Sequence, residues 1–289
     1  MGSKIHIELE GNSPEICSLL RKARKWFLEW ESIFSRFNPQ SELNRLNNRK
    51  GHAFQASETL WNLLYLALQA AKETDGIVNP AVLSSLESSG YALSFEKMPS
   101  INVSIKMDQI TQPISPSFMD IILDVSGFLI ILPERMRLDL GGFAKGWSAD
   151  QAVIRLAESS PVLVDAGGDI RVSGPRLDGQ PWKIGLVDPY QPDESLLVLE
   201  LGQFDSLTAV ATSGIQYHQW MVNRELRHHL IDPRTGKPAQ SDFQQVTIVS
   251  KSALDAEIAA KVVFILGSVK GLGWLDAHPD NFGVLIYCK

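Results

Sequence analysis

The chain has 289 residues, a length that suits one large domain or two closely packed lobes. Hydrophobic residues make up 44% and charged residues 21% of it, a globular composition that excludes disordered, collagen-like and coiled-coil chains. With 27 basic and 33 acidic residues the net charge is −6, so we expect no nucleic-acid partner.

The first residues and the cysteines bear on the compartment. The opening sequence MGSKIHIELE lacks the apolar stretch and cleavage site of a secretory signal. Cys17 and Cys288 show neither metal-ligand spacing nor a disulfide framework, which favours a reducing compartment. The apolar stretch at 121–132 is shorter than the roughly 18 residues that span a bilayer. We expect a cytoplasmic protein without a membrane span, or a periplasmic one if an upstream signal was removed.

Two amphipathic helices are predicted in the first third of the chain. Ser13 and Pro14 fit an N-cap and a first helical residue, and apolar side chains then recur at helical spacing as far as Phe34. A second helix is expected to begin after Ser57 and to end near the turn signal at residues 75–76. We interpret both apolar stripes as packing faces.

Beyond Gly90 the pattern favours strands, because short apolar runs are separated by Gly, Pro and Asp. The runs are VLVDA from Val162, WKIGLV from Trp182, LLVLEL from Leu196 and QVTIVS from Gln245. Helical patterns interrupt them at about 146–157 and 253–266, which predicts an α+β fold of mixed sheets with flanking helices. The polar, proline-rich segment 94–117 is expected to form a loop or a hairpin.

Three glycine-containing segments could bind an anion or could form ordinary turns. LDLGGFAKGWSAD from Leu138 predicts a strand end, a glycine turn and a helix start whose backbone N–H groups could face a phosphate. Its glycines have P-loop spacing, but Trp147 stands where the P-loop lysine belongs, which excludes that motif. Gly167-Gly168-Asp169 fits a hairpin turn or bulge, and Thr212-Ser213-Gly214 fits a phosphate contact or a turn.

A fourth segment, HHLIDPRTGKP, combines histidines with a turn signal. Pro233 and Gly236 predict the turn without any function. His229 lies at the end of an apolar strand beside that turn, where either a structural or a catalytic role is open. Zinc is disfavoured, because no Cys or Asp cluster with metal-ligand spacing surrounds His218, His228 and His229.

Six segments taken in order resemble the ApbE-like family, the FAD:protein FMN transferases. They are FSRFNPQSELNRLN from Phe34, TDGIVNPAV from Thr74, LDLGGFAKG from Leu138, LVDAGGDIRVSG from Leu163, ATSG from Ala211 and HHLIDPRTGKP from His228. The likeness covers nearly the whole chain, so we expect residues 1–289 to form one domain of this type.

The resemblance implies an α+β fold of two intimately packed lobes with the flavin site between them and Mg2+ at the pyrophosphate. It also implies a reaction in which a Thr or Ser hydroxyl of a target redox protein attacks the FMN phosphorus of FAD and AMP leaves. Such phosphoryl transfer needs mainly positioning and charge neutralisation, which backbone amides and a cation can provide.

Site residues follow from the resemblance position by position. Phe37 matches an aromatic of the flavin pocket, and Ser89, Gly90 and Tyr91 match the segment near the isoalloxazine, where the family commonly shows Trp-Gly-Phe. Loss of that Trp is expected to loosen ring stacking.

The remaining positions concern the nucleotide and the metal. Asp139 and Lys145 match contacts to the flavin nucleotide, and Gly142 matches a backbone carbonyl on the metal. His229 and Ile231 match the strand that lines the pyrophosphate, and His229 is the candidate catalytic residue.

One segment departs from the family. SALDAEIAAKVVFILG places Glu257 and Lys261 where the family has a metal-binding Asp and Thr. Residues four apart share one face of a helix, so an ion pair between Glu257 and Lys261 is expected. An ammonium there would repel Mg2+, and we hypothesise that Lys261 stands in for the metal; alternatively Lys261 extends to solvent and the site is inactive.

Three functions remain open at this point. The first is the transferase itself. The second is a protein that binds FAD without transferring FMN, suggested by the substituted pair and the missing Trp. The third is a pyrophosphatase that hydrolyses FAD to FMN and AMP with water as the nucleophile.

Overall fold

The computed structural model describes residues 3–11, 14–49, 51–94, 117–203, 207–216 and 219–288, except for the side chain of Pro192. It divides into two compact units: unit 1 comprises Met1–Gly2, Trp30–Gly142 and Tyr217–Gln240, and unit 2 comprises Ser3–Glu29, Phe143–Gln216 and Ser241–Lys289. The predicted N-cap Ser13, residues 95–116 of the loop predicted at 94–117, and His218 lie outside the described residues.

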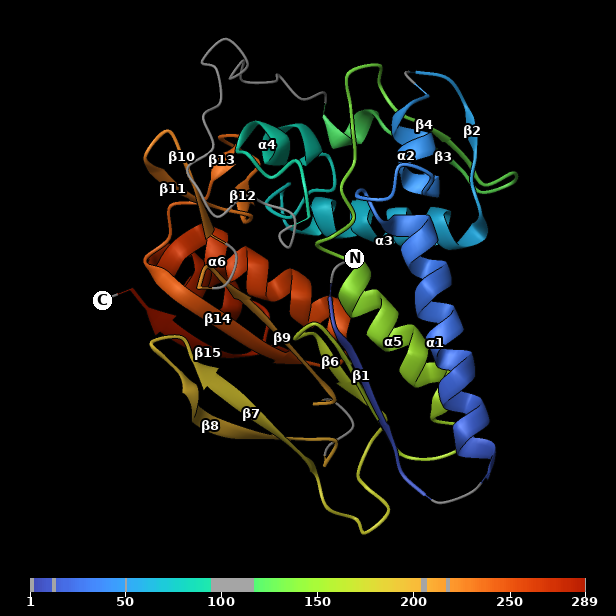
Figure 1. Cartoon of the computed structure of the whole chain (residues 1–289). Coiled ribbons are helices and arrows are strands. Elements are labelled where there is room, and N and C mark those ends of the chain that lie inside the picture. Colours follow the sequence, from blue (N-terminus) through green and yellow to red (C-terminus); the bar gives the residue numbers. More distant parts are fainter. Residues whose placement is uncertain are drawn as a thin grey trace. The chain divides into compact units, whose positions relative to one another are not determined.

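The described part of unit 2 is built on a six-stranded sheet in which every neighbouring pair is antiparallel. Its strands, in spatial order, are β1 (Ile5–Leu9), β5 (Val162–Ala166), β6 (Ile170–Val172), β9 (Ala209–Gly214), β14 (Phe243–Ser250) and β15 (Phe282–Tyr287). Helix α5 (Ala144–Leu156) packs against β5 and β6, and helix α6 (Ala253–Asp276) packs against β9 and β14 (Figure 1).

A hairpin of β7 (Trp182–Asp188) and β8 (Gln191–Leu201) completes unit 2. Trp182 and Leu201 of this hairpin join one buried cluster with sheet residues Leu163, Val172, Val210 and Val249. Because both the helices and the hairpin pack against the six-stranded sheet, strands such as β5 are buried along nearly their whole length. That burial explains the continuous apolar runs of β5 and β14, whereas the runs in β7 and β8 stay partly exposed. All four predicted strands are confirmed.

The predicted helices are present. Helix α1 (Pro14–Phe34) buries Ala23, Phe27, Trp30 and Phe34, as its apolar stripe predicts. Helix α6 runs beyond the expected 253–266, through a non-helical Gly267 with φ 71°. Among the described residues α6 is the helix whose length and composition would suit a membrane span. Its packing against β9, β14 and α5 is that of a core helix.

Unit 1 combines short helices with small sheets. Its elements are α2 (Glu42–Asn47), α3 (Glu58–Glu73), α4 (Leu83–Ser88), the 3-10 helix η3 (Phe118–Asp120), the sheet β2 (Phe54–Gln55), β4 (Leu129–Ile131) and β3 (Ile122–Asp124), and the hairpins β10 (Gln219–Val222) with β11 (Glu225–His228) and β12 (Ile231–Asp232) with β13 (Lys237–Pro238). The Ser57 hydroxyl accepts the Leu60 N–H at 3.1 Å, and Asp75 and Gly76 follow α3 with positive φ, so both predicted ends of α3 are confirmed.

Two sequence interpretations were wrong. Residues 138–140 form no strand, because the Leu138 backbone is hydrogen-bonded on both sides to the Asn47 amide at 2.8 and 2.9 Å. The Asp139 N–H donates to the Pro80 carbonyl at 2.8 Å, so this stretch needs no neighbouring strand. Residues 212–214 form no turn, since they lie within β9 and pair with β14.

The other two turn predictions are confirmed. Gly167 and Gly168 have φ of 71° and 94° and join the antiparallel strands β5 and β6. Residues 233–236 join β12 to β13, and Gly236 has φ 67°.

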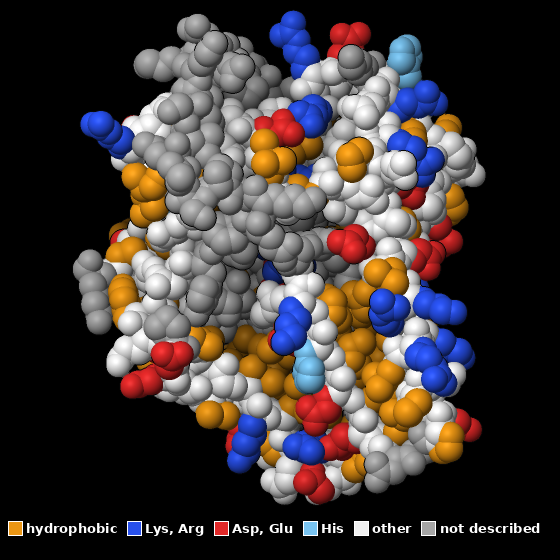
Figure 2. Space-filling model, viewed as in Figure 1, with side chains coloured by type: hydrophobic (Ala, Val, Ile, Leu, Met, Phe, Trp, Pro, Cys, Tyr) orange, Lys and Arg blue, Asp and Glu red, His pale blue; other side chains and the backbone are white. Residues whose placement is uncertain are grey.

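On the face shown in Figure 2, Lys and Arg side chains are interspersed with Asp and Glu side chains.

Helices α5 and α6 touch through their backbones near their N-termini. A Cβ on Gly146 of α5 would lie 2.6 Å from the Ala253 carbonyl oxygen of α6, so glycine permits this approach. Asp150 of α5 accepts the N–H groups of Ala253 and Leu254 at 2.8 and 3.0 Å and thereby caps α6. Burial raises the pKa of Asp150 to about 6 against these N–H donors.

Substitution of Gly146 tests this contact. In an unstrained helix Gly→Ala stabilises by roughly 0.5–1 kcal/mol, whereas we expect Gly146→Ala to destabilise by about 2 kcal/mol through overpacking. Gly273→Ala is the matched control on α6, because nothing lies within 4 Å of its added Cβ, and it is expected to stabilise slightly. Denaturant unfolding of both variants measures the two free energies. A Gly146→Ala variant as stable as the parent would contradict the close contact.

Candidate functional site

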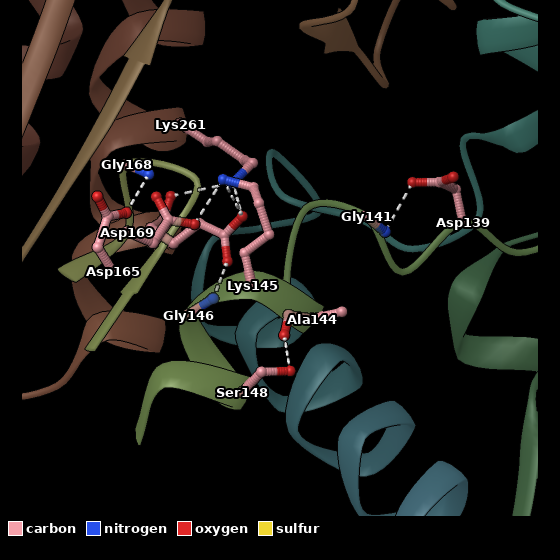
Figure 3. A network of polar contacts seen from close by, with 11 residues as sticks. Asp139, Gly141, Ala144, Lys145, Gly146, Ser148, Asp165, Gly168, Asp169 and Lys261 are labelled. Atoms are coloured by element: carbon pink, nitrogen blue, oxygen red, sulfur yellow. Dashed lines mark hydrogen bonds and ion pairs between the residues drawn. The ribbon is translucent and has the colours of Figure 1, made fainter. Parts of the chain in front are cut away.

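Four charged side chains form a buried cluster in unit 2 (Figure 3), which we call the charge cluster. The ammonium of Lys145, in the first turn of α5, lies 2.6 Å from Asp169 Oδ2 and 3.7 Å from Glu257 Oε1. Lys261 follows Glu257 by one turn of α6 and places its Nζ 3.0 Å from the same oxygen. The side chains of Asp169 and Glu257 are 1% and 2% exposed, so each buried carboxylate has an ammonium partner.

Local folding explains how these residues meet. Gly146 lies in the first turn of α5, and its N–H donates to Glu257 Oε2 at 3.1 Å. Glu257 therefore caps the positive end of α5 from the neighbouring helix. In the turn after β5, the Gly168 N–H donates to Asp165 Oδ1 at 2.7 Å. This turn places Asp169 beside Lys145.

Opposing effects set the pKa values in the charge cluster. Burial raises the pKa of Glu257, but the charges of Lys261 and Lys145 outweigh it and hold that pKa below its usual value. Burial raises the pKa of Asp169, and the negative charge of Glu257 adds to the rise. Burial lowers the pKa of Lys145, yet its carboxylate neighbours raise the net value. Glu257 and Lys145 are therefore both charged at neutral pH.

The residues present do not fit a divalent cation of the family type. Mg2+ requires several oxygen ligands in octahedral geometry. Glu257 instead offers one oxygen to the Lys261 ammonium and the other to the Gly146 N–H. Across the described residues, no group of three or more His, Cys, Asp or Glu side chains could hold a metal ion.

The expected ion pair between Glu257 and Lys261 is present. The alternative in which Lys261 extends to solvent is wrong, because its side chain is only 16% exposed and its Nζ contacts Glu257. Gly142 belongs to unit 1, so its assignment as a metal ligand stays a prediction.

Unit 1 holds a second group of predicted residues, which we call the aromatic cluster. The rings of Tyr91 and Trp220 stack with centroids 5.1 Å apart, and Phe37 meets Tyr91 edge-on at 5.8 Å. The Arg36 guanidinium lies 4.0 Å from the Phe37 ring centre and 4.5 Å from that of Tyr91. Its Nε is 2.8 Å from Asp139 Oδ2, so a buried ion pair fixes the cation between the rings.

The segment before Tyr91 explains how the rings are placed. Gly90 has φ 97°, and a Cβ there would lie 2.9 Å from a Val222 methyl carbon. The Trp220 indole N–H donates to the Ser89 carbonyl at 2.8 Å. Trp220 therefore provides an indole beside the segment in which the family commonly has its own Trp.

The two adjacent histidines of the segment HHLIDPRTGKP, His228 and the candidate catalytic His229, differ in burial. His228 ends β11, its Nε2 lies 3.0 Å from the Ala239 carbonyl oxygen, and burial lowers its pKa. His229 follows and is half-buried. Ile231 is buried in β12, where it pairs with Pro238, and its assignment to the pyrophosphate strand stays a prediction.

Sequence reasoning found most members of both clusters and missed three. Phe37, Tyr91 and Asp139 are brought together in unit 1, but Arg36, which links them, was not singled out although it precedes Phe37. Trp220 had no sequence signal. Asp169 was interpreted as part of a turn; the signal available was an acidic residue directly after a double glycine that ends a buried strand.

Removing the Lys261 ammonium is expected to destabilise the fold in a pH-dependent way. Lys261→Met removes one of the two ammonium groups that balance the negative charge of Glu257. The free energy of unfolding should therefore fall by about 3 kcal/mol near neutral pH. With its pKa held low, Glu257 contributes stability above its unfolded value of 4.5, and that stability is lost as pH falls through the lowered value. In the variant that pKa rises, so the deficit should shrink between about pH 8 and about pH 5.

The control for this prediction is Lys270→Met, an exposed lysine on the same helix. Its unfolding free energy should change by less than about 0.5 kcal/mol at either pH. A Lys261→Met deficit that is equally small, or that grows toward low pH, would contradict the buried ion pair.

Comparison with known proteins finds relatives that match nearly the whole chain. The model of the ApbE family matches residues 1–286. The FAD:protein FMN transferase of Klebsiella pneumoniae is 26% identical over 294 residues, covering 99% of this chain and 86% of that protein. The Haemophilus influenzae protein of the same name is 25% identical over 290 residues, covering 99% of this chain and 79% of its own.

Solved structures agree on the fold. The ApbE protein of Thermotoga maritima superposes with a TM-score of 0.84 at 23% identity, covering 99% of this chain and 91% of that one. The flavinyl transferase ApbE of Pseudomonas stutzeri in its apo form superposes with a TM-score of 0.82 at 20% identity, covering 100% and 89%. The α+β prediction is thus confirmed, and the chain belongs to the ApbE family.

Proposed function

We propose that this chain is an FAD:protein FMN transferase that moves FMN from FAD to a Thr or Ser hydroxyl of a redox protein and releases AMP. The observation that carries the proposal is the match of residues 1–286 to one family whose curated relatives bear that name. The match covers 86% and 79% of those two relatives, so it spans most of each protein rather than a short shared segment.

Taken within its own unit, each cluster has chemistry that suits a flavin nucleotide. The aromatic cluster gathers the rings of Phe37, Tyr91 and Trp220, and such flat apolar side chains suit contact with an isoalloxazine. The charge cluster offers ammonium groups beside the positive end of α5, which suit a diphosphate. The net charge of −6 disfavours long-range attraction of FAD, so binding depends on these local groups.

The transfer step is a phosphoryl transfer with a simple balance. The acceptor hydroxyl oxygen bonds to the FMN phosphorus, and the bond from that phosphorus to the bridging oxygen breaks. AMP leaves with the bridging oxygen and its electron pair, and the hydroxyl proton passes to the imidazole of His229 and then to solvent. Catalysis requires positioning and charge stabilisation more than covalent participation by the protein.

An assay distinguishes this function from its two alternatives. The purified chain is incubated with FAD and an acceptor protein of the family, and AMP release and covalent flavin fluorescence on the acceptor are followed. AMP together with a labelled acceptor supports the transferase. AMP without label identifies a pyrophosphatase, and bound FAD without either product identifies a binding protein.

Tyr91→Ala tests the isoalloxazine contact. Loss of one stacking ring is worth roughly 0.5–1.5 kcal/mol, so the Kd for FAD should rise about 2- to 12-fold. Tyr65→Ala, which removes an exposed tyrosine stacked on Trp61, is the control and should leave the Kd unchanged. Equal Kd values for both variants, measured by flavin fluorescence, would remove Tyr91 from the binding site.

His229→Ala tests the proposed proton acceptor. Loss of a general base should lower kcat for transfer by about 100-fold or more while FAD remains bound. The exposed imidazole of His52 provides the control, since His52→Ala should retain full transfer. If AMP release by His229→Ala stays near the parent rate, the hydroxyl proton has another acceptor.

A further inference from the structure

The charge cluster occupies the place at which the resemblance implies a metal. Glu257 and Lys261 stand where the family has its Asp and Thr, and the structure brings the Lys261 Nζ to 3.0 Å from Glu257 Oε1. A cation therefore already lies against the carboxylate that would have to ligate the ion. The chain supplies that cation from its own sequence.

We propose that the Lys261 ammonium replaces the divalent cation, so that this chain binds the diphosphate of FAD without a metal. The inference rests on the proposed function, because it takes FAD as the ligand. It assigns to Lys261 a binding role in place of the metal-ligating role of the family's Thr.

Charge balance disfavours a divalent cation at this place. Lys145 and Lys261 carry two positive charges, and Asp169 and Glu257 carry two negative charges when both are ionised. The cluster is then neutral before any ion arrives. A divalent cation at Glu257 would meet two ammonium groups at close range in a buried setting, where such repulsion is poorly screened.

The hydrogen-bonding capacity of Lys261 supports its binding role. An ammonium has three N–H donors. Within the described residues, its polar contacts are with Glu257 Oε1 at 3.0 Å and the Glu257 backbone carbonyl at 3.4 Å. One donor is left for an anionic oxygen, and a compact ammonium is a common phosphate ligand in proteins.

The surroundings of Lys261 hold its ammonium in a fixed position. Its side chain is mostly buried and its head group is tied to a glutamate one helical turn away. Glu257 is itself fixed by the Gly146 N–H of α5. The ammonium is therefore pre-organised and loses little freedom when a diphosphate binds.

The first experiment uses the unmodified full chain. Protein dialysed against EDTA is titrated with FAD, and quenching of flavin fluorescence gives the Kd in EDTA and in excess Mg2+. We expect the two Kd values to agree within about twofold. Tightening by Mg2+ of more than about tenfold would overturn the inference while leaving the proposed function intact.

The second experiment restores the family pair. Glu257→Asp combined with Lys261→Thr should weaken FAD binding in EDTA and regain at least about tenfold in Mg2+. Lys261→Arg keeps the positive charge and should stay independent of Mg2+. Lys270→Thr, an exposed position on the same helix, is the control and should match the parent. A double variant that binds FAD equally well with and without Mg2+ would overturn the inference.

A direct metal probe gives a readout independent of FAD. Mn2+, followed by its electron paramagnetic resonance signal, should remain free in the presence of the unmodified chain and bind to the double variant. Tight Mn2+ binding by the unmodified chain would overturn the inference. If the unmodified chain binds no FAD under any condition, both the inference and the proposed function fail, which separates that outcome from metal-dependent binding.

Discussion

The reciprocal capping of helices α5 and α6 is the constraint on which the charge cluster depends. Glu257 of α6 accepts the Gly146 N–H of α5, while Asp150 of α5 accepts the N–H groups of Ala253 and Leu254 of α6. Each helix thus places a carboxylate at the positive end of the other, which satisfies backbone donors that a helix start leaves without partners. The exchange works because Gly146 has no side chain at the point where the two backbones meet.

Burying Glu257 at the helix contact, beside the buried Asp169 of the turn after β5, creates a demand for positive charge. Helix N-termini meet part of it, but a buried carboxylate also needs an ionic partner. Lys145 and Lys261 provide those partners, each from the helix that the capping has fixed. The positions of both ammonium groups are therefore consequences of how the helices pack, and the same packing leaves one of them able to meet an external anion.

Features that depend on neighbouring residues could be predicted from the sequence, whereas features that depend on contacts with distant residues could not. The ends of α3 were correct because Ser57 and the Asp75-Gly76 turn act within a few residues, and the Glu257–Lys261 pair was correct because helical spacing alone brings the two together. Residues 138–140 were misassigned because their hydrogen bonds go to distant partners. Arg36 was missed for the same reason, because two of its partners, Tyr91 and Asp139, lie far along the chain.

Comparison with ApbE structures shows that the backbone fold is kept although most side chains differ. A TM-score of 0.84 at 23% identity means that backbone positions persist while most residues have changed. A helical position four residues after a carboxylate stays on the same face whether it carries a hydroxyl or an ammonium. The hydroxyl can share a metal ion, whereas the ammonium supplies one charge permanently, cannot be removed by a chelator and needs no metal supply. The shared fold therefore keeps such helical positions in place, and the side chains that occupy them decide the chemistry available there.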